Sequence, residues 1–168
     1  KLILNKKYNP LFSSDARYFI ITGGRGSGKS FAVTVFLTLL TMTKGIRILF
    51  TRFTMTSAHL SIIPEFLEKI GLLGFDEVFS INKQEVLNTS NNSDILFRGI
   101  RTSAGNQTAS LKSLQGISTW CLDEAEELID EDIFDTIDLS IREKNIQNRI
   151  ILILNPVTKE HWIYKRFF

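Results

Sequence analysis

The chain has 168 residues, of which 43% are hydrophobic and 23% are charged, and its formal net charge is +2. This length and composition indicate one ordinary globular domain rather than a disordered chain. So small a net charge does not by itself indicate nucleic-acid binding, although nine of the eighteen acids lie between Asp123 and Asp138 and leave a basic excess elsewhere. The single cysteine excludes a disulfide framework, and no apolar run has the length of a membrane span. We therefore expect a soluble, intracellular protein.

Alternating strand and helix patterns predict an α/β fold with a central, mainly parallel sheet flanked by helices. Residues 1–17 form a polar lead-in, which we expect to be a loop with one docked turn. The helix expected at 29–42 is apolar almost all round, apart from a stripe of threonines, so it should be buried on both sides. The segments expected as central strands are 18–22, 47–53, 119–122 and 149–154.

The middle and the end of the chain carry shorter or less regular elements. A helix is expected at 56–70, with Pro64 either starting or kinking it. Residues 101–117 should form a polar loop with one helical turn, and an acidic helix should begin directly after the strand at 119–122. The isoleucines predicted to share one face of this acidic helix are Ile129, Ile133, Ile137 and Ile141. Three short strands, expected as an antiparallel addition at the sheet edge, span 77–81, 85–88 and 94–98, and a last amphipathic segment spans 161–168.

Residues 23–30 read Gly-Gly-Arg-Gly-Ser-Gly-Lys-Ser and fit the phosphate-binding pattern GxxxxGK[ST]. The motif stands between an expected strand and an expected helix, which is the context that it requires. Glycines let successive backbone N–H groups turn toward phosphates, and the helix N-terminus favours the anion. A Gly/Ser-rich loop that matches by chance is the alternative. The motif predicts a nucleoside triphosphate site formed by Gly23, Gly24, Arg25, Gly26, Ser27, Gly28, Lys29, Ser30 and Phe31.

A second motif, Asp123-Glu124, ends the short apolar run at 119–122. In phosphate-loop proteins an acid at the end of a buried strand holds the Mg²⁺ that bridges the phosphates. Asp123 fits this role, and the Ser30 hydroxyl can be a second ligand. A further acid directly after it, Glu124, can polarise the attacking water as a general base, which favours hydrolysis. The alternative is that the two acids only begin an exposed acidic helix.

The chain resembles a known family, the ATPase domain of the large terminases of tailed bacteriophages, which package DNA. The resemblance extends from about Tyr8 to Phe168. The segments that carry it are Gly-Gly-Arg-Gly-Ser-Gly-Lys-Ser at 23–30, Leu-Gln-Gly-Ile at 114–117, Leu-Asp-Glu-Ala at 122–125 and Leu-Asn-Pro at 154–156. The loop arginine, Leu-Gln-Gly and the Asn-Pro that precedes Trp-Ile-Tyr-Lys are its specific parts. The resemblance implies a P-loop NTPase of the additional-strand catalytic-glutamate, or RecA-like, type.

The resemblance also implies roles for single residues. Glu124 and Lys29 would be catalytic, and Arg25 resembles a loop arginine that acts in cis on the γ-phosphate, although a structural clamp to a nearby acid is equally open. Asn155 matches the position that senses loss of the γ-phosphate and couples it to DNA movement. An amide at a strand end can hydrogen-bond both water and phosphate, but Asn155 can also be a plain turn residue before proline. The implied substrate is ATP with Mg²⁺, and the preference over GTP depends on the resemblance alone.

Further candidates follow from the way in which the family assembles, as a ring of usually five subunits on the capsid portal. A neighbouring subunit can then donate a basic residue in trans, for which the candidates are Arg101, Lys112 and Arg142. Candidates for an adenine pocket before the first strand are Tyr8, Asn9 and Arg17. Arg52 and Arg98, at or near strand ends, could contact phosphates or DNA, although most such arginines are solvated or paired.

The implied function is ATP hydrolysis that powers translocation of double-stranded viral DNA into a procapsid in the host cytoplasm. The implied partners are DNA, the portal protein and the small terminase subunit, without a membrane, and the isolated domain is expected to be monomeric. Both ends of the chain suggest that residues 1–168 are a single ATPase domain of a longer protein. No segment matches the family's C-terminal nuclease, so we expect no DNA cleavage. The alternatives are another nucleic-acid-driven ATPase, such as a helicase or recombinase core, and a nucleotide-binding assembly module with little turnover.

Overall fold

The computed structural model describes residues 2–55, 58–102, 105–106 and 108–168, without the side chains of residues 58, 59, 61, 102 and 106. The strands are β1 Tyr18–Thr22, β2 Arg47–Thr54, β3 Phe79–Ile81, β4 Glu85–Asn88, β5 Asp94–Thr102, β6 Gly105–Asn106, β7 Thr119–Leu122 and β8 Arg149–Leu154. Within the described residues they form one sheet in the order β1-β8-β7-β2-β5-β4-β3, with β6 paired to β5. The first five strands in this order are parallel, and β4, β3 and β6 are antiparallel additions.

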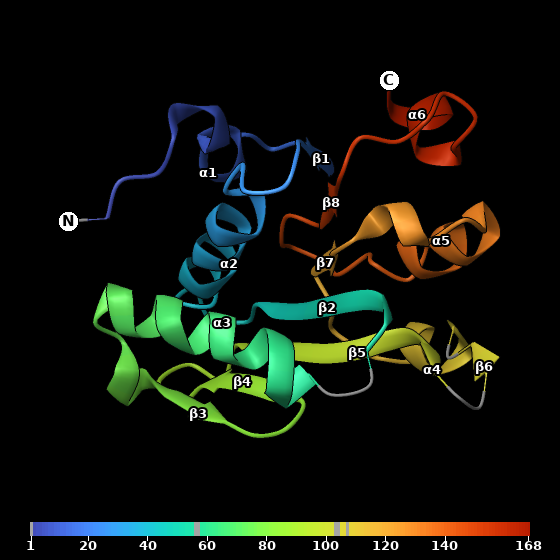
Figure 1. Ribbon diagram of the computed structural model, residues 1–168. Helices are drawn as coiled ribbons and strands as arrows, with labels where there is room; N and C mark the ends of the chain where they lie inside the picture. Colours follow the sequence, from blue (N-terminus) through green and yellow to red (C-terminus); the bar gives the residue numbers. More distant parts are fainter. Residues whose placement is uncertain (1, 56–57, 103–104, 107) are drawn as a thin grey trace.

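The helices cover both faces of this sheet. They are α1 Pro10–Ser13, α2 Lys29–Leu40, α3 Ala58–Leu73, α4 Thr108–Lys112, α5 Glu131–Asp138 and α6 Trp162–Phe167. In Figure 1, α2 and α3 lie on the left of the view, and α5 and α6 lie on the right. The described helices include none that is long and apolar enough to cross a membrane.

Side chains alternate between the two faces along each strand, which divides the core in two. Phe50 of β2 packs with the α2 and α3 side chains, and its ring lies 5.6 Å from that of Phe66. On the opposite face, Trp120 of β7 packs with α5, and the ring of Phe134 lies between it and Trp162 at 5.3 and 4.8 Å. The predicted α/β fold, a mainly parallel sheet flanked by helices, is therefore confirmed. The antiparallel edge addition is confirmed only for β3 and β4: the prediction for 94–98 is wrong, because β5 pairs in parallel with β2 and belongs to the central sheet.

The first long helix, α2, is largely buried although a stripe of threonines runs along it. α2 places Thr34 and Thr38 in the interior, as it does most of its apolar residues. The hydroxyl of Thr38 donates to the Thr34 carbonyl at 2.9 Å, and that of Thr41 donates to the Thr38 carbonyl at 2.7 Å. Because these hydroxyls are satisfied within the helix itself, their burial leaves no unpaired donor.

The prediction of one acidic helix directly after residue 122 is wrong. Glu124 has a left-handed backbone with φ of 53°, a short 3-10 turn spans Ala125–Glu127, and α5 begins only at Glu131. Asp130 caps this helix by accepting a 3.0 Å hydrogen bond from the backbone N–H of Asp132. The predicted isoleucine face is correct only in part: Ile133, Ile137 and Ile141 pack into one core cluster, but Ile141 lies beyond the helix end and Ile129 is 73% exposed. Within α5 itself, the buried apolar residues are Phe134, which was not predicted, and Ile137, which was.

Several other boundaries differ by a few residues. The helix expected at 56–70 is observed as Ala58–Leu73, with Pro64 inside it, and residues 56 and 57 lie outside the described part of the chain. β3 begins at Phe79, after a 3-10 turn over Asp76–Val78, and β5 continues past the expected end to Thr102. The lead-in contains two short turns, a 3-10 turn at Lys6–Tyr8 and α1.

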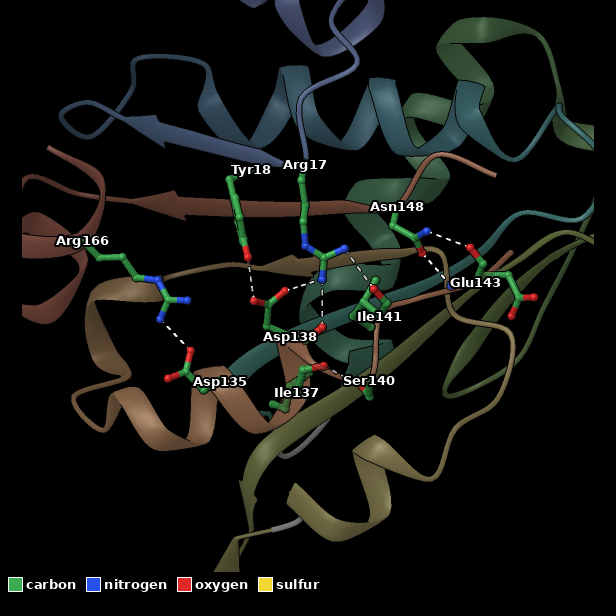
Figure 2. Close-up of polar contacts among 10 residues, drawn as sticks. All are labelled: Arg17, Tyr18, Asp135, Ile137, Asp138, Ser140, Ile141, Glu143, Asn148 and Arg166. Atoms are coloured by element: carbon green, nitrogen blue, oxygen red, sulfur yellow. Dashed lines mark hydrogen bonds and ion pairs between the residues drawn. The ribbon is translucent and has the colours of Figure 1, made fainter. Parts of the chain in front are cut away.

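Polar side chains tie α5 to both ends of the fold, as Figure 2 shows. The carboxylate of Asp138, at the end of α5, accepts hydrogen bonds of 2.6 Å from Arg17 and 2.7 Å from the Tyr18 hydroxyl. At the exposed side of the helix, Arg166 of α6 contacts Glu131 and Asp135. These contacts hold α5 between the first strand and the last helix.

Candidate functional site

A cavity of about 360 Å³ lies at the carboxyl ends of β1, β2, β7 and β8. In open parallel sheets this edge is where ligands bind, because the loops that follow neighbouring strands converge there. The cavity is lined by the predicted phosphate loop and by polar side chains from three further strand ends. Its lining residues are Arg25, Gly26, Ser27, Gly28, Lys29, Ser30, Phe31, Arg52, Asp123, Glu124, Glu126, Ile153, Leu154 and Asn155.

The loop between β1 and α2 has the backbone that its glycines allow. Gly26 and Gly28 have φ angles of +77° and +80°, which other residue types rarely adopt, and Gly28 is the N-cap of α2. The carbonyl of Ser27 accepts hydrogen bonds from the Tyr8 hydroxyl at 2.9 Å and from Lys7 Nζ at 3.3 Å. The turn at Lys6–Tyr8 therefore holds the phosphate loop through the Ser27 carbonyl.

Lys29 lies within this loop and is only 9% exposed. Its ammonium group donates to the carbonyls of Gly23 and, at 3.0 Å, of Gly24. It also lies 3.4 Å from Oδ1 of Asn155, at the end of β8. The loop thus surrounds a buried positive charge beside a helix N-terminus, an arrangement that favours a polyanion such as a nucleotide phosphate chain.

Asp123 follows β7 directly and is 4% exposed, which excludes the alternative that it begins an exposed helix. Its backbone N–H donates to the Thr51 carbonyl at 2.9 Å, which extends the pairing of β7 with β2 by one residue. The carboxylate accepts hydrogen bonds on Oδ2 from Nε of Arg52 at 2.9 Å and from Nη2 at 2.7 Å. The sequence did not indicate this pair, because Arg52 and Asp123 become neighbours only through the strand register.

The donors around the cavity fit Mg²⁺. Asp123 supplies a carboxylate and Ser30 a hydroxyl to the same cavity, and hard oxygen donors of this kind suit a small divalent cation that also binds phosphates. Bound there, Mg²⁺ would neutralise charge on the β- and γ-phosphates.

Glu124 stands at the same edge, in a strained conformation. Its φ of 53° lies in the left-handed region, which costs a residue other than glycine about 1 kcal/mol or more and is found preferentially at functional sites. Burial raises the pKa of the Glu124 carboxyl above its ordinary value; the Asp123, Glu127 and Glu126 charges add to this increase, whereas Arg52 opposes it. A carboxylate with a raised pKa is a better proton acceptor than an ordinary one.

Asn155 connects the phosphate loop to the segment after β7. Its Nδ2 donates a 2.6 Å hydrogen bond to Oε1 of Glu126, while its Oδ1 faces Lys29. The carbonyl of Glu126 lies 3.1 Å from Nε2 of His161, the N-cap residue of α6. Sequence reasoning missed Glu126, because nothing in the acidic run distinguishes it from Glu127.

The other predicted site residues are distributed unevenly. Arg25 is exposed at the phosphate-loop cavity, and Tyr8 lines an adjoining apolar cavity of about 270 Å³ along β1. Asn9 is exposed and lines neither cavity, and Arg17 is turned away to Asp138. The structure therefore does not place Arg17 with the phosphate loop. The three candidates for a residue that acts in trans, Arg101, Lys112 and Arg142, are all exposed and lie outside the phosphate-loop cavity. Arg98 donates to the carbonyls of Phe97 and Gln84.

The fold and the loop together define a P-loop nucleotide-binding domain of the RecA-like type. Residues 15–168 match the family described as phage terminase large subunit. The chain belongs to this family, and the resemblance noted in the sequence is confirmed. A search of curated proteins found no match.

Several solved structures from bacteriophages are similar to this chain. The large terminase of a thermophilic bacteriophage is 11% identical, with a TM-score of 0.77, and the match covers 99% of this chain and 42% of that terminase. The complex of the same terminase with ATP-γ-S is also 11% identical, with a TM-score of 0.72, and covers 96% and 40%. The N-terminal domain of the DNA packaging ATPase from bacteriophage phi29 is 16% identical, with a TM-score of 0.70, and covers 99% and 86%. This chain thus spans about two fifths of the thermophilic phage's large terminase.

Proposed function

We propose that residues 1–168 form an ATPase domain that hydrolyses ATP with Mg²⁺ to drive double-stranded viral DNA into a procapsid. The observation that carries the proposal is that Lys29, Asp123, Glu124 and Asn155 surround one cavity although they come from three separate strand ends. Membership in the terminase family supports the assignment to packaging. The relative from the thermophilic phage binds ATP-γ-S, and the phi29 relative is a DNA packaging ATPase.

Each residue around the cavity would have a different role in hydrolysis. The loop N–H groups and Lys29 would hold the β- and γ-phosphates, while Ser30 and Asp123 would hold Mg²⁺. Glu124 would take a proton from the water that attacks the γ-phosphorus, and ADP would leave. Arg25, exposed at the same cavity, would neutralise charge on the γ-phosphate in cis.

Asn155 would sense whether the γ-phosphate is present. Its amide already contacts Lys29 on one side and Glu126 on the other, so a shift of the lysine toward phosphate changes one of its two partners. Tyr8, beside the loop, is the adenine-pocket candidate that the structure favours, because it lines the apolar cavity along β1.

Assembly is the part of the proposal that extends beyond this chain. We propose a homo-oligomeric ring, with five subunits as in the family, on the portal protein and with the small terminase subunit, in the host cytoplasm. Arg101, Lys112 and Arg142 are all exposed, as a residue that acts on a neighbouring subunit's nucleotide has to be.

Phosphate release from ATP tests the proposed reaction. We expect Mg²⁺-dependent turnover that rises with double-stranded DNA and falls by about 10²–10⁴-fold in Glu124→Gln, with ATP binding retained. Glu127→Gln, which changes an exposed acid three residues away, is the matched control and should be unaffected. Lys29→Ala should lose ATP binding itself. ATP binding without turnover in wild type, with or without DNA, would favour an assembly module instead.

A further inference from the structure

Arg52 occupies a distinctive position between the acids of the site. It follows Thr51, which pairs with Leu122 in the parallel register of β2 and β7, so it reaches the acids that end β7. Both Nε and Nη2 donate to a single oxygen of Asp123, at 2.9 and 2.7 Å. The guanidinium is also 3.7 Å from Glu124, and the arginine side chain is 22% exposed.

The guanidinium of Arg52 lies near more than one carboxylate. Besides Asp123 and Glu124, Glu65 of α3 lies close enough that Arg52 and Asp123 both influence its carboxyl: burial raises the pKa of Glu65, Asp123 adds to the increase, and Arg52 opposes it. Among these acids, Glu124 at 3.7 Å is the alternative anionic partner within reach of Arg52. The hydrogen bonds of Arg52 go to the one carboxylate that is almost fully buried, because an unpaired buried charge is the most costly.

The same carboxylate is the proposed ligand of Mg²⁺. A divalent cation held by Asp123 would lie within a few ångströms of the guanidinium, and like charges at that range in a partly buried site repel strongly. Each cation alone neutralises Asp123, so the two compete for it.

We propose that Arg52 is a positioning residue that competes with Mg²⁺ for Asp123 and transfers to Glu124 when the metal binds. The transfer keeps Asp123 neutralised with either partner, and it holds the Glu124 carboxylate in place once the metal is bound. Arg52 thereby sets the Mg²⁺ concentration at which the site fills. This inference depends on the proposed Mg²⁺-dependent binding of ATP.

A matched control lies on the same strand. Arg47, at the other end of β2, pairs with Asp94, which is buried like Asp123, through contacts of 3.1 and 3.2 Å. Arg47 does not line the phosphate-loop cavity. Arg47→Gln and Arg52→Gln therefore each remove one arginine from a buried aspartate, and only the second removes it from the proposed metal ligand.

The experiment titrates Mg²⁺ at a fixed concentration of a fluorescent ATP analogue and measures its binding, with the thermal midpoint recorded in parallel. We expect Arg52→Gln to lower the half-saturating Mg²⁺ concentration about tenfold. Arg47→Gln should leave it unchanged, although both variants should have lower midpoints without ligand. Arg52→Lys, which keeps the charge but loses the two-nitrogen contact, should fall between wild type and Arg52→Gln.

An unchanged or higher Mg²⁺ requirement in Arg52→Gln would overturn the competition, and a higher one would mean that Arg52 instead orients Asp123 for the metal. If Arg52→Gln does not fold, Arg52→Lys decides alone, because competition requires its Mg²⁺ requirement to lie below that of wild type. Absence of any Mg²⁺-dependent binding in wild type would refute the proposed function itself. The two failures are therefore distinguishable.

Discussion

Nδ2 of Asn155 donates a 2.6 Å hydrogen bond to Oε1 of Glu126, which joins the end of β8 to the turn after β7. The other carboxylate oxygen of Glu126 is buried and has no hydrogen-bond partner within the described part of the chain. His161 contacts the Glu126 carbonyl through Nε2, while its Nδ1 accepts from the N–H of Ile163 and caps α6. The Asn155 amide thus lies between the phosphate loop and the last helix.

We predict that Glu126→Ala separates ATP binding from turnover. Glu126 contacts the phosphate loop only through Asn155. The affinity for ATP should therefore stay within about twofold, whereas turnover should fall by about twofold to thirtyfold, the range of ~0.5–2 kcal/mol typical of coupling residues. Steady-state ATPase kinetics and nucleotide titration measure the two quantities. Glu127→Ala, in the same turn but exposed, is the control. Equal losses in both variants would contradict a specific role of Glu126.

Arg17 should matter for stability and not for nucleotide binding. Arg17→Met removes the 2.6 Å contact to Asp138 and two hydrogen bonds to carbonyls, and leaves the buried carboxylate with the Tyr18 hydroxyl. We expect a loss of about 1–3 kcal/mol in the free energy of unfolding, below the range for fully buried pairs because Arg17 is partly exposed. Urea unfolding measures it.

Arg166→Met is the comparison for Arg17, since Arg166 contacts Glu131 and Asp135, which are far more exposed than Asp138. Figure 2 shows the contact of Arg166 with Asp135. Exposed pairs of this kind contribute about 0–1 kcal/mol.

Nucleotide affinity should be unchanged in Arg17→Met. A tenfold loss of affinity would restore Arg17 to the adenine pocket.

Phe134 should be among the most costly residues to truncate. It is fully buried, and its ring contacts those of Trp120, Trp162 and Phe167. Phe134→Ala should lower the free energy of unfolding by about 3–5 kcal/mol. Leu139→Ala, one residue beyond α5 and 71% exposed, should change it by no more than about 0.5 kcal/mol. Comparable losses in the two variants would mean that α5 does not pack as described.

The single cysteine provides a probe of opening. Cys121 is fully buried in β7, and burial raises the pKa of its thiol well above the ordinary value. Because alkylation needs an accessible thiolate, we expect iodoacetamide to label the folded protein far more slowly than the unfolded protein. Mass spectrometry after timed labelling in increasing urea should follow global unfolding. Rapid labelling without denaturant would show that β7 is more open than the structure indicates.

Much of the fold was predictable from the sequence, but not the path of the chain after β7. The central strands and α2 were predicted within a residue or two, because buried parallel strands and an all-apolar helix have strong local patterns. The isoleucine spacing at 129–141 predicted the wrong start for the helix, since the cap at Asp130 and the left-handed backbone of Glu124 outweigh periodicity. The cap at Asp130 and the left-handed backbone of Glu124 depend on the path that the chain takes as it leaves the sheet after β7.

The sequence by itself determined the phosphate loop and the acids after β7. Both are local: the loop needs left-handed backbone at Gly26 and Gly28, and Asp123 needs only to end a buried strand. Which distant residues meet these motifs was decided by the tertiary structure alone. Strand order places Asn155 beside Lys29, and the register of β2 with β7 places Arg52 against Asp123. Long-range pairing depends on which faces are buried together, and no short segment of sequence contains that information.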